Sequence, residues 1–188
     1  MKIVDIVSVA ALIRKINELP NACIFRGQSN AEWALRSTLE RVCGPGWDPG
    51  LADRLERLSL REFSSKYHLY DHHGLRPVSR LAWLSLMQHH GVPTRLLDFS
   101  ESPYVALYFA LAAYDFQARG DLSLFAIDYK KLMDQSLALL AQRHPCFSET
   151  RHSVFEKQEE VFEEVLYGRD YEVAWVTEPK LFNSRLDR

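Results

Sequence analysis

The sequence predicts an α+β fold in which a small sheet is surrounded by helices. Two short apolar segments, residues 22–25 and 122–127, have the length and composition of buried strands. The segments around them place apolar residues at helical spacing, and strands and helices follow one another without strict alternation. This order favours an α+β domain over a sheet of regularly alternating parallel strands.

Capping and breaking residues predict where the helices begin and end. Ser8 and Asp48 are expected to cap two helices, Gly91 to end a third, and Pro103 to begin a fourth. Gly27 is expected to end the first strand, and the turn-rich segment 43–50 is expected to form a loop. Helices are expected over residues 9–19, 51–70, 81–90, 103–113 and 129–142, and a late strand over residues 171–176.

Length and composition predict one globular domain over residues 1–188. Of the 188 residues, 47% are hydrophobic and 26% charged, which is ordinary for a globular protein. The polar, acidic and poorly periodic stretch 143–169 is expected to be an excursion or a lid. The net charge of -2 offers no overall basic field for nucleic acid, but it does not exclude a local basic patch.

Cysteine spacing and the N-terminus predict a cytoplasmic protein. Cys23, Cys43 and Cys146 are widely spaced, so neither a disulfide framework nor a thiolate zinc site is expected. The N-terminal segment resembles neither a signal peptide nor a membrane span, and no membrane partner is expected. P-loop, Rossmann and esterase-elbow motifs do not occur in the sequence.

Arg26 follows an apolar triplet, which places a permanent charge at the boundary of the expected core. Such a charge needs an anionic partner because an unpaired buried charge is costly. Two alternatives follow. Arg26 either forms a structural salt bridge, with Asp98 as one candidate partner, or contacts an anionic ligand.

The segment 88–102 concentrates polar and titratable side chains between two apolar helices. Loops between rigid elements often carry binding or catalytic groups. The structural alternative is a turn in which Asp98, Ser100 or Ser102 caps the next helix.

Histidine pairs at residues 72–73 and 89–90 do not have the i, i+4 spacing of zinc ligands on a helix, so no metal is expected. A neutral imidazole of His89 or His90 that orients a substrate hydroxyl is the preferred interpretation. Four aromatic residues could stack on a base or a nicotinamide ring, or could simply belong to the core: Trp33, Trp47, Tyr104 and Tyr108.

Several segments together resemble the FRG domain family. They are Phe25-Arg26-Gly27-Gln28-Ser29, residues 33–39 and residues 89–100. The resemblance extends through residues 102–110, and residues 178–186 resemble the late region of the family. Its members often look like parts of bacterial toxin or phage-defence systems.

The order of an arginine after an apolar strand and a Ser-rich turn before a helix also resembles NAD-dependent ADP-ribosyltransferases. The resemblance implies a small split sheet, mixed or antiparallel, with surrounding helices. It implies a transferase that uses NAD as a substrate to modify RNA, DNA or protein. Arg26 would hold the NAD phosphates or ribose, Ser100 would brace the nicotinamide side, and Glu172 is the candidate carboxylate.

The expected site and partners follow from these resemblances. The expected catalytic residues are Arg26, His89, Ser100 and Glu172, and the expected NAD contacts are Arg26, Gly27, Gln28, Thr94, Arg95, Asp98 and Tyr108. The expected partners are NAD, the macromolecular target, and an antitoxin or partner chain. A Gln-x-Gly-x-Phe strand is expected soon after Arg185 but is absent before Arg188. If that strand carries the third active-site residue, the chain is expected to be inactive alone, truncated, or completed by a partner.

Two other functions stay open at this point. One is a binding module that recognises a nucleotide or nucleic acid through Arg26, Arg95 and the aromatic residues, without chemistry. The other is a nuclease or hydrolase that uses His89, His90 and Asp98, with or without a metal.

Overall fold

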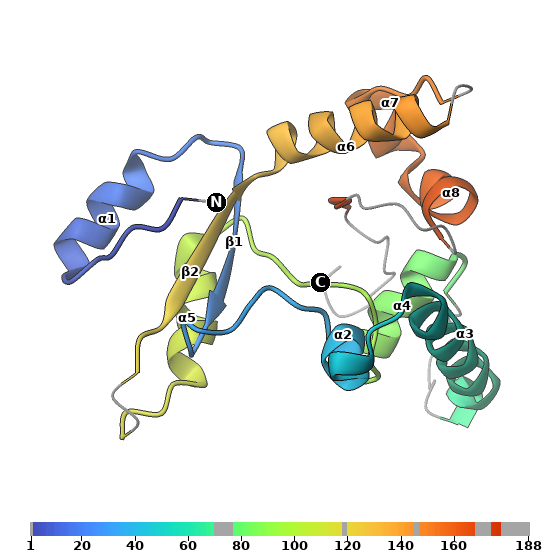
Figure 1. The fold of residues 1–188 in the computed structure, drawn as a ribbon, viewed down its shortest axis with the longest axis horizontal. Coiled ribbons are helices and arrows are strands. Elements are labelled where there is room, and N and C mark those ends of the chain that lie inside the picture. Colours follow the sequence, from blue (N-terminus) through green and yellow to red (C-terminus); the bar gives the residue numbers. More distant parts are fainter. Residues whose placement is uncertain (1, 70–76, 118–119, 145–146, 168–173, 178–188) are drawn as a thin grey trace, which may run out of the picture. The chain divides into compact units, whose positions relative to one another are not determined.

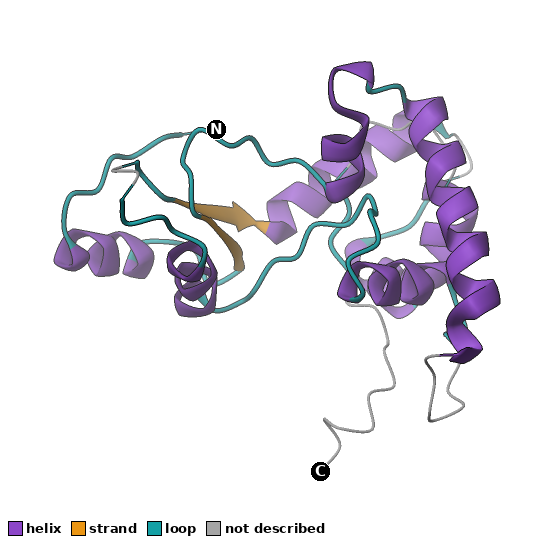
Figure 2. Ribbon diagram, turned by 90° about the horizontal axis from the view of Figure 1, so that it is seen from below, coloured by secondary structure: helices purple, strands orange, loops and turns teal. Residues whose placement is uncertain are grey.

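The described part of the chain combines many helices with one two-stranded antiparallel sheet (Figures 1 and 2). It is a computed structural model that describes residues 2–69, 77–117, 120–144, 147–167 and 174–177. The described elements are α1 (Val9–Asn17), β1 (Cys23–Gln28), α2 (Thr38–Cys43), η1 (Gly44–Gly46), α3 (Pro49–Lys66), η2 (Tyr67–Leu69), α4 (Arg80–His89), α5 (Pro103–Ala112), β2 (Ser123–Asp128), α6 (Tyr129–Arg143), α7 (Arg151–Glu156), α8 (Gln158–Val161) and η3 (Phe162–Leu166). The predicted α+β class is confirmed at this level.

The chain divides into two compact units, each made of two separate stretches of sequence. Unit 1 contains residues 1–34 and 98–132, and unit 2 contains residues 35–97 and 133–188. Each unit is described below by itself. The prediction that residues 1–188 form a single domain stays a prediction.

Unit 1 is built on the pairing of β1 with β2 and on the packing of α5 against β1. The register pairs Phe25 with Ala126 and Gly27 with Leu124. Cys23, Phe25 and Ala106 form its buried apolar cluster, with Leu124 packed against it. Because side chains alternate along a strand, Cys23, Phe25 and Gly27 share the face that α5 covers.

The glycine of β1 allows the helix to come this close. A Cβ built on Gly27 would lie 1.9 Å from the carbonyl oxygen of Ala106 and 2.9 Å from the Cβ of Ala110. Ala106 and Ala110 are themselves small and buried. Gly27 therefore does not end the strand, as the sequence had suggested; β1 continues to Gln28, and the missing side chain makes room for α5.

The edge of β1 that does not pair with β2 forms hydrogen bonds with one residue of the turn before α5. Phe25 N donates to the carbonyl oxygen of Ser100 at 2.7 Å, and Ser100 N donates to the carbonyl oxygen of Phe25 at 2.8 Å. Ser102 then caps α5 by accepting a hydrogen bond from Val105 N. The expected helix start at Pro103 is confirmed, and the turn that precedes it is fixed to the strand.

Unit 2 is helical, and its core joins residues from both of its sequence stretches. Leu81, Leu84 and Met87 of α4 form a buried cluster with Phe162 and Tyr167. A second cluster contains Met133 and Leu137 of α6 with Val154 and Val161. The stretch 143–169, expected as an excursion or a lid, thus carries α7, α8 and η3 and supplies buried core residues. Movement of a lid there stays a prediction.

Most predicted helix ends agree with the structure because they depend on local hydrogen bonds. Ser8 and Asp48 accept hydrogen bonds from Ala11 N and Leu51 N as N-caps of α1 and α3. Gly91 has φ of +77°, as expected of a glycine that follows a helix end.

The segment 43–50 is less irregular than predicted, because the 3₁₀ turn η1 lies between α2 and α3. The predicted strand over 171–176 lies partly outside the described residues, and residues 174–177 have no regular secondary structure. Among the helices that the structure describes, none has both the length and the apolar character to span a membrane.

Replacing Gly27 tests the close approach of α5. We expect Gly27→Ala to lower the free energy of unfolding by about 2 kcal/mol or more, because the backbone of α5 must move to admit a Cβ. Chemical denaturation measures this change. Gly46→Ala is the matched control, since a Cβ there meets no atom within 4 Å, and its effect should stay within about 0.5 kcal/mol. Equal losses in the two variants would contradict the explanation.

Candidate functional site

The face of the sheet opposite α5 carries a group of polar side chains. Arg26 and Gln28 alternate with Phe25 and Gly27 along β1, so they project from the other face. Ser123 of β2 is paired directly with Gln28 and therefore points to the same side. We call Arg26, Gln28 and Ser123 the polar face of the sheet.

Two oxygen atoms of the polar face are buried and make no hydrogen bond. Gln28 is 7% exposed, and neither its Oε1 nor the Oγ of Ser123 has a hydrogen-bond partner in the described part of the chain. Buried polar atoms without partners are uncommon, and each one calls for an explanation such as a water molecule or a ligand. The polar face thus has unused hydrogen-bonding capacity beside a guanidinium group.

Arg26 is anchored through the main chain of the turn before α5. Its Nη1 donates to the carbonyl oxygen of Asp98 at 2.7 Å. The observed hydrogen bond therefore goes to the backbone and not to the Asp98 carboxylate that the sequence suggested as a salt-bridge partner. This contact fixes the direction of the guanidinium and keeps its positive charge at the polar face.

Ser100 lies next to Arg26 in space, but its side chain points to the other face of β1. It pairs with Phe25, and paired residues point to the same side of a sheet. Its Oγ accepts a hydrogen bond from Ser102 N at 3.1 Å. The structure thus brings the backbone of Ser100 to the site, while its hydroxyl shapes the turn into α5.

Gly27 and Tyr108 also lie away from the polar face. Gly27 faces α5, where its role is steric. Tyr108 is 66% exposed on α5 and packs edge to face against Phe109. Because α5 covers the opposite face of the sheet, the structure does not bring Tyr108 together with Arg26.

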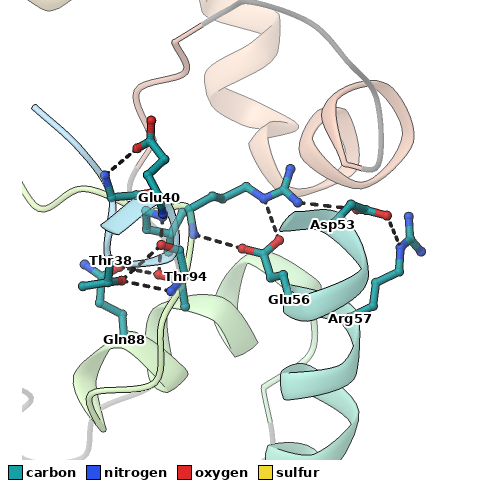
Figure 3. A network of polar contacts seen from close by, with 10 residues as sticks. Thr38, Glu40, Asp53, Glu56, Arg57, Gln88 and Thr94 are labelled. Carbon is teal, nitrogen blue, oxygen red and sulfur yellow. Dashed lines mark hydrogen bonds and ion pairs between the residues drawn. The ribbon is translucent and has the colours of Figure 1, made fainter. Parts of the chain in front are cut away.

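Thr94 belongs to unit 2 and is fully buried in a network of hydrogen bonds (Figure 3). Its hydroxyl donates to Gln88 Oε1 at 2.7 Å, and its amide donates to the hydroxyl of Thr38 at 3.0 Å. The hydroxyl also accepts from Leu96 N. Thr94 therefore ties the segment after α4 to α2, and its role as an NAD contact stays a prediction without support from these contacts.

Arg95, the next residue, forms an ion pair with a fully buried carboxylate. Its Nε donates to Glu56 Oε2 at 2.6 Å, and its backbone amide donates to Glu56 Oε1 at 2.9 Å. Asp53 lies 3.5 Å from Nη2 and also pairs with Arg57 (Figure 3). Burial raises the pKa of Glu56 above its ordinary value, and this effect outweighs the opposing attraction of Arg95.

The ring of Tyr167 contacts three arginines of unit 2, and Arg95 is one of them. The guanidinium carbons of Arg80, Arg57 and Arg95 lie 4.0, 4.8 and 5.0 Å from the centre of its ring. Such distances are typical of cation–π contacts. Tyr167 is 5% exposed, and burial raises the pKa of its hydroxyl. This cluster joins α3, α4 and the segment after η3 into one structural unit.

The remaining predicted residues fall elsewhere. His89 is exposed at the end of α4 in unit 2, where its ring lies 5.4 Å from that of His90. Asp98 contributes its carbonyl oxygen to unit 1, where it accepts the hydrogen bond from Arg26. Glu172 lies outside the described residues. Among those described, no cluster of three or more histidine, cysteine or acidic side chains is arranged to hold a metal ion.

Sequence reasoning missed Ser123, Glu56 and Tyr167. Ser123 is the only polar residue of the segment 122–127, a signal that could have marked it. Glu56 lies among charged residues of an amphipathic helix, so no local pattern distinguishes it from its exposed neighbours. Tyr167 follows an irregular acidic stretch, and only the assembled unit shows that it is buried.

Removing Arg95 tests the buried ion pair. We expect Arg95→Ala to lower the free energy of unfolding by about 3 kcal/mol, because the carboxylate of Glu56 is left buried without its cation. Arg57→Ala is the matched control: Arg57 also contacts Asp53 and the ring of Tyr167, but it is half exposed. Its loss should stay below about 1 kcal/mol. Urea denaturation measures the free energy of unfolding of both variants. A larger loss in Arg57→Ala than in Arg95→Ala would contradict a stabilising role of the buried pair between Arg95 and Glu56.

The raised pKa of Glu56 predicts a pH dependence of stability. The folded protein holds the Glu56 proton more tightly than the unfolded chain, whose reference pKa is 4.5. The contribution of Glu56 to stability is therefore fully present below about pH 4.5 and falls as the pH rises through the higher folded-state pKa. Denaturation measured at increasing pH, from about pH 4.5 upward, should show that the free energy of unfolding of wild type falls relative to that of Glu56→Gln. An increasing advantage of wild type would show that the pKa is lowered instead.

Comparison with known proteins identifies the family. No curated protein and no solved structure matches the chain. The profile of the FRG domain matches residues 21–118, slightly more than half of the chain, and includes β1, α5 and the intervening segments described above. The expected resemblance is thus confirmed, and the chain belongs to the FRG domain family.

Proposed function

We propose that this protein is an NAD-dependent ADP-ribosyltransferase-like enzyme that modifies a macromolecule, as a toxin or phage-defence effector. The observation that carries the proposal is the polar face of the sheet. There Arg26 lies beside two buried oxygen atoms, on Gln28 and Ser123, that make no hydrogen bond in the described part of the chain. A ligand with an anionic group and several hydroxyl or amide donors would match this set.

NAD has these groups. Its pyrophosphate is anionic, and a guanidinium presents a planar fork that suits phosphate oxygens. Its ribose hydroxyls and carboxamide can donate hydrogen bonds to Gln28 Oε1 and Ser123 Oγ. The contact between Arg26 and Asp98 holds the guanidinium in position before the ligand arrives.

In the proposed reaction, the bond between C1′ of the ribose and N1 of nicotinamide breaks. Nicotinamide leaves with the bonding electron pair, and a nucleophilic atom of the target forms a bond to C1′ and loses a proton. Positive charge develops on the ribose in the transition state, so the enzyme must stabilise an oxocarbenium-like sugar. A carboxylate suits this task, and Glu172 remains the candidate that we propose for it.

The remaining predicted residues act indirectly in this proposal. Ser100 fixes the turn before α5 through its two main-chain hydrogen bonds with Phe25. It thereby positions the carbonyl oxygen of Asp98, which orients Arg26. Gly27 allows α5 to pack against the sheet from behind. Ser100 and Gly27 are thus positioning residues, whereas Arg26 and Gln28 contact the substrate.

Replacement of Gln28 separates a functional role from a structural one. Gln28→Met keeps the approximate shape and removes an oxygen that makes no hydrogen bond, so we expect folding stability to stay equal or rise slightly. We expect NAD binding to weaken about tenfold, since the ligand loses a hydrogen bond to a buried group. Isothermal titration with NAD, beside thermal unfolding of both proteins, measures the two effects.

Activity is tested by incubating the intact protein with NAD labelled in the adenylate part and with cell extract. We expect transfer of label to a macromolecule and release of nicotinamide, both lost in Arg26→Lys, which keeps the charge but not the planar fork. Absence of transfer and release in wild type would reject the enzyme. NAD binding without either would instead support a binding module.

A further inference from the structure

Unit 2 contains a cavity of about 520 Å³ that the proposed reaction does not use. Ser59, Glu62, Phe63 and Lys66 line it from one stripe of α3, at the i, i+3, i+4, i+7 spacing of a helix face. His90 and Val92 line it from the turn after α4. Gly91 lies between these two with φ of +77°, so the chain reverses there and both neighbours can face α3.

Two of the side chains that line this cavity, Phe63 and His90, are aromatic, and we call the cavity the aromatic pocket. The ring of Phe63 lies 5.7 Å from that of His90 and 6.3 Å from that of Trp83. Trp83 and Tyr67 both contact Phe63 and also pack against one another, with 5.3 Å between their ring centres. Phe63 is thus held by rings that support it from within unit 2, while His90 is exposed.

Charged side chains line the aromatic pocket beside these rings. Lys66 Nζ and Glu62 Oε2 lie 3.1 Å apart, and both side chains are more than half exposed. An exposed pair of this kind contributes little to stability and can open at small cost. The pocket therefore offers a cation, a carboxylate and a stacking surface, all accessible from solvent.

We propose that the aromatic pocket binds a nucleobase together with its attached phosphate. The base would stack on the exposed ring of His90, which Phe63 supports from the other side of the contact, as bases stack on aromatic side chains in other proteins. The carboxylate of Glu62 would accept a hydrogen bond from an exocyclic amino group, and Lys66 would contact the phosphate. Adenine and cytosine carry such an amino group at the base edge, whereas thymine does not.

This chemistry has two possible sources, a free nucleotide and a base within a single strand. Both present the same ring, amino group and phosphate. The proposal does not depend on the NAD reaction, because none of the residues of the aromatic pocket belongs to the polar face of the sheet.

Binding to the intact protein tests the proposal. The probe is a fluorescein-labelled single-stranded oligodeoxyadenylate followed by anisotropy, with the oligothymidylate for comparison. We expect saturable binding that is tighter for oligodeoxyadenylate. His90→Ala should weaken it about tenfold, the loss expected of one stacked base. His68→Ala is the matched control, an exposed histidine at the end of the same helical region that does not line the pocket, and it should bind as wild type does.

Two further variants examine the polar contacts. Lys66→Ala should reduce the dependence of log K on log salt concentration by about 0.7, as for one phosphate contact on a single strand. Glu62→Gln should reduce the preference for adenine over thymine. Thermal unfolding confirms that each variant is folded.

Competition with AMP identifies the source. If AMP displaces the labelled strand, the pocket accepts a free nucleotide; if it does not while the strand binds, the pocket requires a strand. Both results support the proposal. It is overturned if neither oligodeoxyadenylate nor directly titrated AMP binds, or if folded His90→Ala binds as wild type does. It is also overturned if Arg26→Lys abolishes binding while His90→Ala leaves it intact, because the ligand then occupies the polar face of the sheet.

Discussion

The close approach of α5 to β1 at Gly27 is the constraint on which unit 1 depends. A helix backbone can lie this near a strand only where the strand lacks a side chain, and the strand supplies glycine while the helix supplies Ala106 and Ala110. Once α5 is in place, the residues just before it must lie along the free edge of β1, where Ser100 pairs with Phe25. The alternation of the strand then leaves Arg26 and Gln28 on the opposite face. The steric fit on one face thereby defines the polar face on the other.

Features that depend on a few neighbouring residues could be predicted from the sequence. The caps Ser8, Asp48 and Ser102 and the glycine after α4 act through hydrogen bonds and dihedral angles within one turn of helix. Both strands were placed within one to three residues. The role of Arg26 as a residue at the boundary of the core could also be inferred, because a charge beside apolar residues needs a partner wherever the chain folds.

Features that depend on the strand register or on the assembled units could not be predicted from the sequence. Ser123 joins the polar face only because the antiparallel register pairs it with Gln28, and the register is set by residues 90 or more positions apart in the chain. The polar density of the segment 88–102 suggested a ligand site, yet Thr94 and Arg95 make their hydrogen bonds within unit 2. A buried ionic network and a ligand site use the same residue types, so composition alone does not separate them.

The core of unit 2 also has a consequence for how the chain folds during synthesis. Leu81, Leu84 and Met87 are buried against Phe162 and Tyr167, about 80 positions later, and residues of unit 1 lie between the two stretches. When α4 leaves the ribosome, Phe162 and Tyr167, which cover it in the folded protein, have not yet emerged. The apolar surface of α4 therefore stays accessible to chaperones until residues 162–167 have emerged, and a chain interrupted before them leaves it uncovered.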